Sequence, residues 1–225
     1  MSPTVADQTL TLGGHEMQLL PERAIHWPHR RWLLVADTHW GKCQTFRDAG
    51  AGLSSGPLRA DLERLRLAAQ RVDAQRIVVL GDLIHSRATF APGMRELLAS
   101  WRGELNCELA LVPGNHDRVL TGPRGAQHLR DWAIELLPER VEADGLVLAH
   151  EPPDIAGPPT LCGHVHPAVR MRGRGESMKL PCFWFEHACN ALVLPAFSSF
   201  ADGACIKSGP EDQRWAIAAD RVLRV

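Results

Sequence analysis

Short apolar runs alternate with amphipathic segments through the first half of the chain. The runs span Trp32 to Ala36, Ile77 to Leu80 and Leu109 to Val112, and each stops abruptly at polar residues, as a buried strand does. Between the runs, segments that begin at Pro57 and Pro92 carry apolar residues at helical spacing. This order of strand, helix, strand, helix and strand predicts a parallel sheet.

Further elements are predicted on either side of this unit. Apolar and polar residues alternate before and after Gly13-Gly14, which predicts a β-hairpin, and a helix is expected around Gln127 to Leu136. Beyond that helix the chain breaks into short β-like pieces: Gly145 to Ala149, Thr160 to Cys162, Ala168 to Met171, Cys182 to Phe185, Ala191 to Leu194 and Trp215 to Ala218. Because no repeat or convincing linker interrupts the chain, we predict one α/β domain with two sheets over residues 1–225.

Composition and charge narrow the class of protein. Hydrophobic residues make up 45% of the chain and charged residues 23%, which is ordinary for a globular domain. A net charge of −1 lacks the basic excess of a dedicated nucleic-acid binder, so contact with DNA or RNA needs a local patch or bound cations. No apolar stretch approaches the roughly 20 residues of a membrane span. The sequence shows no signal peptide and no CxxC pair, so we expect a cytoplasmic protein with reduced thiols.

Polar residues follow each predicted strand of the first half. Asp37-Thr-His39 comes after the first strand, Asp82 after the second and Asn115 after the third. In parallel sheets ligands gather beyond the carboxyl ends of the strands, and these side chains are all expected there. Taken singly, each segment has an ordinary interpretation as a helix cap or a surface turn. Their common position at strand ends favours a shared site.

Three histidines in the second half extend the pattern. His150 follows a predicted strand, and His164 and His166 stand on one face of an extended segment because side chains alternate. Such a segment could also be a sheet edge with two solvent-facing imidazoles. A purely structural role for all five polar segments would leave polar groups against a core without partners, at roughly 1–3 kcal/mol each. Metal coordination removes that cost, and the sequence therefore predicts a metal site.

The ordered motifs D-x-H, G-D, G-N-H-D, a lone His and G-H-x-H resemble the calcineurin-like metallophosphoesterase superfamily. The resemblance implies a two-sheet α/β/β/α sandwich that holds two divalent cations. It assigns one cation to Asp37, His39 and His166, the other to Asn115, His150 and His164, and makes Asp82 the bridge. His116 matches the superfamily's non-ligand histidine near the scissile phosphate.

The charges of such a site suit a phosphate ester. Two divalent cations carry four positive charges, and two aspartates and one bridging hydroxide carry three negative charges, so the site keeps about one positive charge. The cations lower the pKa of the bridging water, so that hydroxide forms near neutral pH and attacks phosphorus in line. His116 is expected to assist the leaving group, and Asp117 to orient His116. His85 stands where many superfamily members have a carboxylate. His85 is either a structural histidine, or it contacts the substrate phosphate or transfers a proton.

Longer segments resemble the bacterial ligase-associated DNA damage response phosphoesterases, over about residues 32 to 200. They include Ala36-Asp-Thr-His-Trp-Gly-Lys42, Gly81-Asp-Leu-Ile-His-Ser86, Gly114-Asn-His-Asp-Arg118 and Gly163-His-Val-His-Pro167. That family implies a Mn²⁺-dependent DNA endonuclease or phosphodiesterase linked to DNA repair. It also implies functional association with an ATP-dependent DNA ligase, a helicase and an exonuclease. Trp40 replaces the family's usual Leu, which should alter one wall of the pocket.

Basic residues near the motifs are the candidates for substrate binding. Lys42, Arg47, Arg87 and Arg118 follow the metal motifs and would ring the site if those loops converge. Arg170, Arg172 and Arg174 alternate after the last motif and could form an edge that tracks a backbone. The ordinary interpretation of each is a solvated surface charge.

Other functions stay open at this point. A hydrolase of a nucleotide-lipid would need an apolar channel or helical lid, whereas a small phosphodiesterase or a phosphatase would differ in its turnover of diesters and monoesters. A catalytically silent scaffold would have lost ligands that are all present here. The mixed nitrogen and oxygen donors accept Mn, Fe, Zn or Co, with Mn²⁺ expected from the resemblance. The apolar second half leaves room for a homodimer surface.

Overall fold

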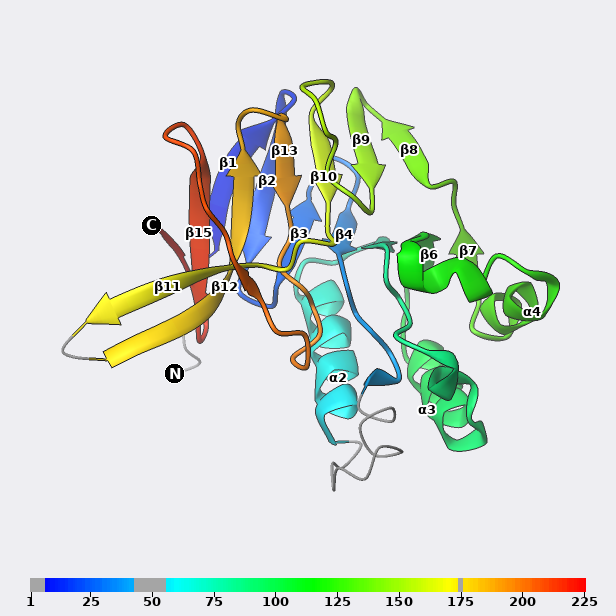
Figure 1. Cartoon of the computed structure of the whole chain (residues 1–225). Helices are drawn as coiled ribbons and strands as arrows, with labels where there is room; N and C mark the ends of the chain where they lie inside the picture. Colours follow the sequence, from blue (N-terminus) through cyan, green and yellow to red (C-terminus); the bar gives the residue numbers. More distant parts are fainter. Residues whose placement is uncertain (1–6, 43–55, 174–175) are drawn as a thin grey trace.

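The computed structural model describes residues 7–42, 56–173 and 176–225, and Figure 1 shows their arrangement. A seven-stranded sheet carries its strands in chain order from β1 to β7. Strands β1 to β4 pair antiparallel, whereas β4 to β7 pair parallel, as the strand–helix alternation predicts. The strands are β1 (Gln8–Leu12), β2 (His15–Leu20), β3 (Ala24–Trp27), β4 (Trp32–Val35), β5 (Arg76–Leu80), β6 (Glu108–Val112) and β7 (Ile134–Leu136).

A second sheet is built by the rest of the chain. Its strand order is β14-β11-β12-β13-β10-β9-β8, with β15 added to β12 and β16 added to β15. Strands β9, β10 and β13 are parallel neighbours. The strands are β8 (Arg140–Ala143), β9 (Leu146–Ala149), β10 (Thr160–Cys162), β11 (Pro167–Gly173), β12 (Glu176–Glu186), β13 (Ala191–Val193), β14 (Ala204–Cys205), β15 (Gln213–Ala218) and β16 (Arg221–Arg224).

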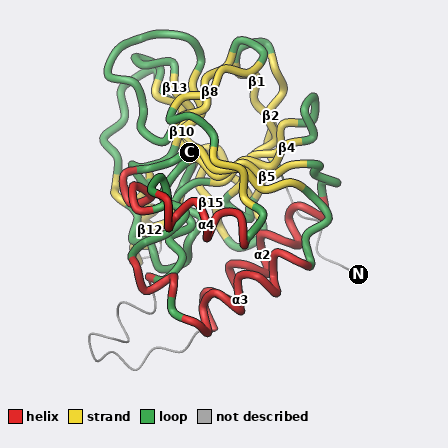
Figure 2. The backbone as a smooth tube through the Cα atoms, turned by 90° about the vertical axis from the view of Figure 1, so that its right-hand side faces the viewer, coloured by secondary structure: helices red, strands yellow, loops and turns green. Residues whose placement is uncertain are grey.

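Helices cover the outer face of the first sheet, and Figure 2 shows them gathered on one side of the strands. They are α2 (Gly56–Arg71), α3 (Pro92–Gly103), α4 (Pro123–Asp131) and the short 3-10 helices η1 (Arg87–Phe90) and η2 (Asn115–Val119). The apolar stripes of α2 and α3 bury Leu62, Leu65, Leu98 and Trp101 against this sheet in one hydrophobic cluster. The predicted helices at Pro57 and Pro92 are thereby confirmed.

The core between the sheets takes side chains from both. Trp27, Leu34 and Val78 of the first sheet pack with Phe183 and Leu192 of the second in a single cluster. Residues spaced by two along each strand face this core, as expected for half-buried strands. The α/β class and the two-sheet architecture are confirmed.

Loops cover the far side of the second sheet in the part of the chain that the structure describes. There Cys162, Trp184 and Val193 are covered by Cys189 and Ile206, which lie outside the helices. The covering segment contains Gly203, Gly209 and Pro210, which disfavour a helix. All described helices belong to the first sheet, so the layers are helix, sheet, sheet and loop.

One predicted helix was wrong over its second half. Helix α4 ends at Asp131, and Ala133 takes a left-handed φ of 47° that stops the helix. Ile134–Leu136 then joins the first sheet as β7, beside β6. The apolar spacing suited both a helix and a strand, and pairing with an open sheet edge decided it. The described residues contain no helix long and apolar enough to cross a membrane.

Candidate metal centre

Three loops at the carboxyl end of the parallel strands converge at one edge of the first sheet. β4, β5 and β6 run in register, so the residues that follow them lie side by side. The loops are tied together by backbone bonds from Asp37 N to Gly81 O at 3.1 Å and from His39 N to Asp82 O at 2.9 Å. Asp37, His39 and Asp82 are thereby fixed at neighbouring points.

The second sheet brings its histidines to the same edge. His150 follows β9 and Gly163 follows β10, and the amide of Gly163 donates to the carbonyl of His150 at 2.9 Å. The amide of His164 donates to Asp37 Oδ2 at 2.9 Å, across the gap between the sheets. The candidate centre is therefore built from both sheets.

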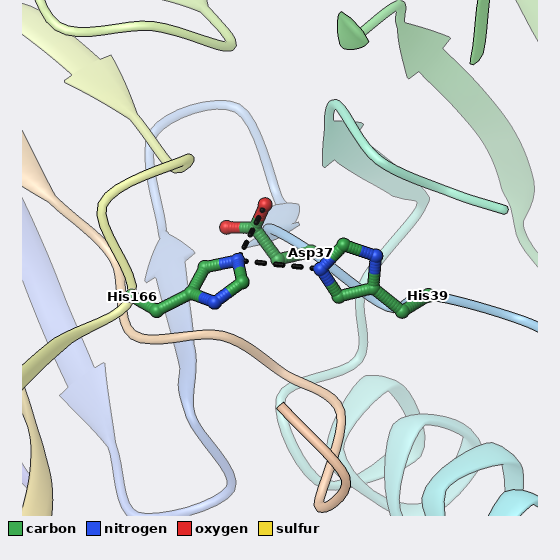
Figure 3. Close-up of side chains that lie close together, drawn as sticks. All are labelled: Asp37, His39 and His166. Carbon is green, nitrogen blue, oxygen red and sulfur yellow. Dashed lines mark hydrogen bonds and ion pairs between the residues drawn. The ribbon is translucent and has the colours of Figure 1, made fainter. Parts of the chain in front are cut away.

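Asp37, His39 and His166 form the first group of donors, and Figure 3 shows them converging. The Nε2 atoms of His39 and His166 lie 3.3 Å apart, and His166 Nε2 lies 3.2 Å from Asp37 Oδ1. Burial, reinforced by the charges of His166 and Lys42, lowers the pKa of His39 to about 2. Burial also opposes charge on His166, but the neighbouring carboxylate of Asp37 outweighs it and raises the pKa of His166. His39 is thus neutral, as a metal ligand must be.

The second group centres on His150. Its Nε2 lies 3.0 Å from Asn115 Oδ1, 3.1 Å from His164 Nδ1 and 3.5 Å from Asp82 Oδ1. Its Nδ1 lies 3.0 Å from the carbonyl oxygen of Leu80, which only accepts, so the proton of a neutral ring sits on Nδ1. The lone pair of Nε2 then faces the side-chain oxygens of Asn115 and Asp82, which are acceptors too. One bound cation would satisfy all of them.

These distances fit the coordination of metal ions. Two donors bound about 2.0–2.2 Å from one cation stand roughly 3–3.5 Å apart, which is the spacing found in both groups. Asp37, Asp82 and His150 also bring ligand atoms within 4.8 Å of one another, so two buried carboxylates are close neighbours. Within the described ranges neither aspartate forms an ion pair with Lys or Arg, and Asp37 Oδ1 is buried without a hydrogen bond. The donor set therefore fits divalent cations.

The backbone is strained at these donors. Asp37, His39, Asp82, His164 and His166 all have φ between 45° and 69°, a left-handed region that costs non-glycine residues roughly 1–2 kcal/mol each. Such strain persists where the surroundings hold it, and it clusters at functional sites. Here the left-handed backbone directs five side chains, from loops of both sheets, toward the candidate metal centre.

Glycine at two motif positions allows the loops to approach. A Cβ on Gly81, whose φ is 78°, would stand 2.1 Å from His150 Nδ1. A Cβ on Gly163 would stand 2.6 Å from Asp37 Oδ2. Each glycine therefore packs directly on a candidate ligand from a different motif.

A known protein family has a model that matches the part of the chain containing these donors. The model of the calcineurin-like phosphoesterase family matches residues 30–166, a span that contains every predicted ligand. The chain belongs to the calcineurin-like phosphoesterase family. Members typically bind two divalent metal ions, and the Asp and His groups that could hold them are present here.

Two solved structures resemble this phosphoesterase to different degrees. The crystal structure of Pseudomonas putida nuclease MPE is similar with a TM-score of 0.80 and 31% identity, covering 97% of this chain and 100% of that one. YfcE, a phosphoesterase from E. coli, has a TM-score of 0.38 and 19% identity, covering 84% of this chain and 88% of that one. No curated protein sequence matches the chain significantly. The family match and the similarity to the Pseudomonas putida structure confirm the predicted fold and a metal-dependent phosphoesterase.

Two further imidazoles border the metal centre of this phosphoesterase. The ring of His116 stacks on that of His85 at 5.3 Å, and both lie 5.5–5.6 Å from His39. The amide of His116 donates to Asp82 Oδ1 at 3.0 Å, and its side chain is 40% exposed. Burial and the charges of Lys42 and His116 lower the pKa of His85. The predicted pair of His116 and His85 is thus brought to the centre, with His116 open to solvent.

Asp117 does not orient the ring of His116 as predicted. Its buried carboxylate accepts hydrogen bonds from the amides of Leu83 at 3.2 Å, Ile84 at 3.1 Å and Gly114 at 3.0 Å. Burial raises the pKa of Asp117 to about 6, although these amide bonds oppose the rise. The loops that carry Asp82 and Asn115 are thereby clamped together. Asp117 is a positioning residue.

We predict that Asp117→Ala weakens both folding and metal binding. Three amides, those of Leu83 and Ile84 buried and that of Gly114 half-buried, would lose a charged acceptor, so the free energy of unfolding should fall by about 3 kcal/mol or more in a urea titration. Mn²⁺ affinity should fall by about 10–100-fold, because support of the ligands is lost.

Asp212→Ala is the matched control. Asp212 also accepts three hydrogen bonds, from Trp184 Nε1, His187 N and Gly209 N, at residues outside the metal centre. It should lose stability and keep its Mn²⁺ affinity. Equal metal affinity in both variants would show that Asp117 does not hold the ligand loops.

The predicted basic ring is only partly assembled. Lys42 is half-buried and close enough to His39, His85 and His166 to oppose their protonation. Arg118 is exposed and lines a pocket of about 290 Å³ with Asn115, His150 and Glu151. Arg87 is exposed at the start of η1 and makes no ion pair among the residues that the structure describes. Arg47 lies outside the described residues.

A network at the first group of donors was missed by sequence reasoning. Asp61 of α2 accepts from Arg64 Nη1 at 2.8 Å and from the amide of Ser199 at 2.9 Å, while Arg23 donates to the carbonyl of Ser198 at 3.0 Å. This loop in turn binds the strand end, because the amide of Ser198 donates to Asp37 O at 3.2 Å. An aspartate on the apolar stripe of a helix is the signal that could have revealed it.

Proposed function

We propose that this calcineurin-like phosphoesterase is a two-metal phosphodiesterase that cleaves DNA as a Mn²⁺-dependent endonuclease. The observation that carries the proposal is the convergence of two donor groups beside an exposed His116, at an edge open to solvent. An enclosed pocket would select a small ester, whereas an open edge admits a phosphate within a long chain. The similar Pseudomonas putida protein bears the name nuclease, which supports DNA or RNA as the substrate class.

Seven residues are proposed to hold the two cations. One ion would be held by Asp37, His39 and His166 and the other by Asn115, His150 and His164, with Asp82 shared. When bound, the ions would supply Lewis acidity toward the phosphoryl oxygens and acidify a water that serves as nucleophile. The buried carboxylates hold charge that favours their binding, and the neutral imidazoles add donors without adding charge.

His116 is proposed to assist the leaving group. Its Nδ1 lies 3.3 Å from the carbonyl oxygen of His85, an acceptor, so a proton there leaves Nε2 to face the substrate. In the protonated ring Nε2–H donates its proton to the departing ester oxygen, which becomes an alcohol, and His116 becomes neutral. The stacked ring of His85 holds this orientation and offers a second imidazole beside the substrate phosphate.

DNA repair is the proposed setting. The motif resemblance supports functional association with an ATP-dependent DNA ligase, a helicase and an exonuclease. We further propose that the protein is cytoplasmic and that residues 1–225 form one domain. All five described cysteines, among them Cys162 and Cys182, are free thiols. Mn²⁺ is proposed as the native metal on the same resemblance, since mixed nitrogen and oxygen donors also accept Fe, Zn and Co.

The test is hydrolysis of bis(p-nitrophenyl) phosphate, p-nitrophenyl phosphate, and nicked, linear and circular DNA with Mn²⁺. We expect turnover of the diester, linearisation or nicking of circular DNA, and weak turnover of the monoester. A protein that binds two metal ions but hydrolyses only the monoester would be a phosphatase, and the proposal would be wrong. Diester turnover without DNA cleavage would leave a phosphodiesterase of small substrates.

A further inference from the structure

The β11–β12 hairpin leaves the second sheet immediately after His166 and projects away from the body of the protein (Figure 1). Its strands pair antiparallel as far as Gly173 and Glu176. Because Pro167 opens β11, the hairpin is joined to a candidate metal ligand by a single peptide bond. The base of the hairpin therefore lies next to the candidate metal centre.

The register divides the hairpin into two faces. Side chains of directly paired residues point to the same side, and successive pairs alternate. One face carries the pairs Arg170 with Lys179 and Arg172 with Ser177. The other is apolar and carries the pair of exposed methionines, Met171 and Met178, at 40% and 60% exposure.

The basic face has two cationic groups available to a ligand. Arg170, Arg172 and Lys179 are all exposed. Lys179 is engaged by Asp202 and by the carbonyl of Gly203. Arg170 makes one hydrogen bond of 3.4 Å to Ser177 Oγ, and neither arginine forms an ion pair with any residue the structure describes. On a chain of net charge −1, this is a local concentration of positive charge.

The basic face also opens onto the metal centre. A pocket of about 150 Å³ is lined by His166 together with Ala168, Lys179 and Pro181 of the hairpin. Ala168 and Pro181 are paired on the same face as Arg170, two residues nearer the body. Arg170 and Arg172 thus follow Ala168 along the same face, away from the pocket. Each pair of residues along the strand adds about 6.8 Å.

The other side of the centre is mixed in charge. Arg118 lines a separate pocket there with Asn115 and His150 of the second donor group, together with Glu139 and Glu151. The hairpin pocket borders His166, which belongs to the first group. A polyanion that crosses the metal centre would therefore meet a concentration of positive charge on the hairpin side of its scissile phosphate.

We propose that the basic face of the β11–β12 hairpin binds the sugar–phosphate backbone of the nucleic acid beyond the scissile phosphate. The proposal rests on the proposed function and adds where the chain runs. Arg170 and Arg172 contact phosphates to one side of the cleaved bond, and their guanidinium groups form charge-assisted hydrogen bonds to phosphate oxygens. A second copy of the protein suits this face less well, because it would bring its own basic face to the interface.

The test compares Arg170→Gln/Arg172→Gln with the wild type on bis(p-nitrophenyl) phosphate and on single-stranded DNA of about 20 nucleotides. We expect KM for the DNA to rise about tenfold, and the slope of log affinity against log salt to flatten by about 1.4, at about 0.7 for each phosphate contact. Turnover of the small diester should stay within twofold, because it cannot reach the hairpin.

Two controls separate charge from structure. Arg170→Lys/Arg172→Lys keeps both charges and should retain most of the salt slope. Arg95→Gln/Arg130→Gln removes two exposed arginines from α3 and α4, at the other end of the molecule in Figure 1, and should behave as the wild type.

The outcomes distinguish this proposal from the proposed function. If the wild type hydrolyses neither ester, the proposed function is wrong, and DNA binding by fluorescence anisotropy then decides the role of the hairpin. Equal salt slopes in the wild type and the glutamine variant would overturn the hairpin proposal. If, in addition, the wild type is a dimer in light scattering and the glutamine variant is a monomer, the hairpin is a surface for self-association instead.

Discussion

Asp82→Asn is expected to reduce kcat/KM for both bis(p-nitrophenyl) phosphate and DNA by about three orders of magnitude or more. The amide has lost the negative charge that two neighbouring cations would share, so at least one ion should be released at working Mn²⁺ concentrations. Loss of one ion forfeits several kcal/mol of stabilisation of the phosphoryl charge, and about 1.4 kcal/mol corresponds to a factor of ten. The measurement is steady-state hydrolysis over a range of Mn²⁺ concentrations.

The side chain of Asp82 keeps its shape in this variant, so the fold should survive. Far-UV circular dichroism and the urea midpoint serve as checks, and Asp131→Asn, an exposed aspartate on α4, is the matched control with expected wild-type activity. Asp82→Asn with near-normal turnover and a normal Mn²⁺ requirement would show that the carboxylate is not shared between two ions.

His116→Ala is expected to separate the two substrates. Removal of a general acid typically costs 10²–10⁴-fold, and that full loss should appear on DNA, whose leaving group is an alkoxide that needs a proton. On bis(p-nitrophenyl) phosphate the leaving group is a stable phenolate, so the loss should be less than about tenfold. The comparison is kcat/KM on each substrate at saturating Mn²⁺.

The control for His116 is His187→Ala. His187 is also an exposed histidine, paired with Glu211 outside the metal centre, and its removal should change neither substrate. A His116→Ala protein that loses both activities equally would place His116 in metal binding or in the support of Asp82. Equal retention of both would remove it from the mechanism.

Much of the candidate site could be predicted because it depends on strand ends. Apolar runs identify β4, β5 and β6, and the parallel arrangement places Asp37, Asp82 and Asn115 at one edge before any coordinates are known. This inference needs only the period of a strand and the direction of its neighbours. The predicted extended segment at His164 and His166 was wrong, because both residues lie in the loop between β10 and β11 with left-handed φ.

Contacts between loops could not be predicted in the same way. The sequence places Asp117 beside His116, but its carboxylate turns toward Leu83 and Ile84, more than thirty residues earlier in the chain. The role of Asp61 depends on a loop near Ser199 that sequence spacing does not bring close. Such hydrogen bonds follow from how the loops fold over one another. The strain at the left-handed donors is visible only in the backbone.

The cover of the second sheet could not be predicted for a similar reason. Strands of the second sheet were recognisable from runs such as Thr160–Cys162 and Ala191–Val193, which are buried on both sides. Burial of both faces requires a cover, but it does not say whether the cover is a helix or a loop. In the described chain, Ile206 and Cys189 supply it from loops.

The most direct test of the two-metal account is the number of Mn²⁺ ions bound per chain. Metal-free wild-type protein titrated with Mn²⁺, followed by calorimetry and by metal analysis after gel filtration, is expected to bind two ions. Asp82→Asn should bind one or none under the same conditions, and Asp131→Asn should bind two. A wild-type stoichiometry of one, with the same value in Asp82→Asn, would contradict a pair of ions bridged by Asp82.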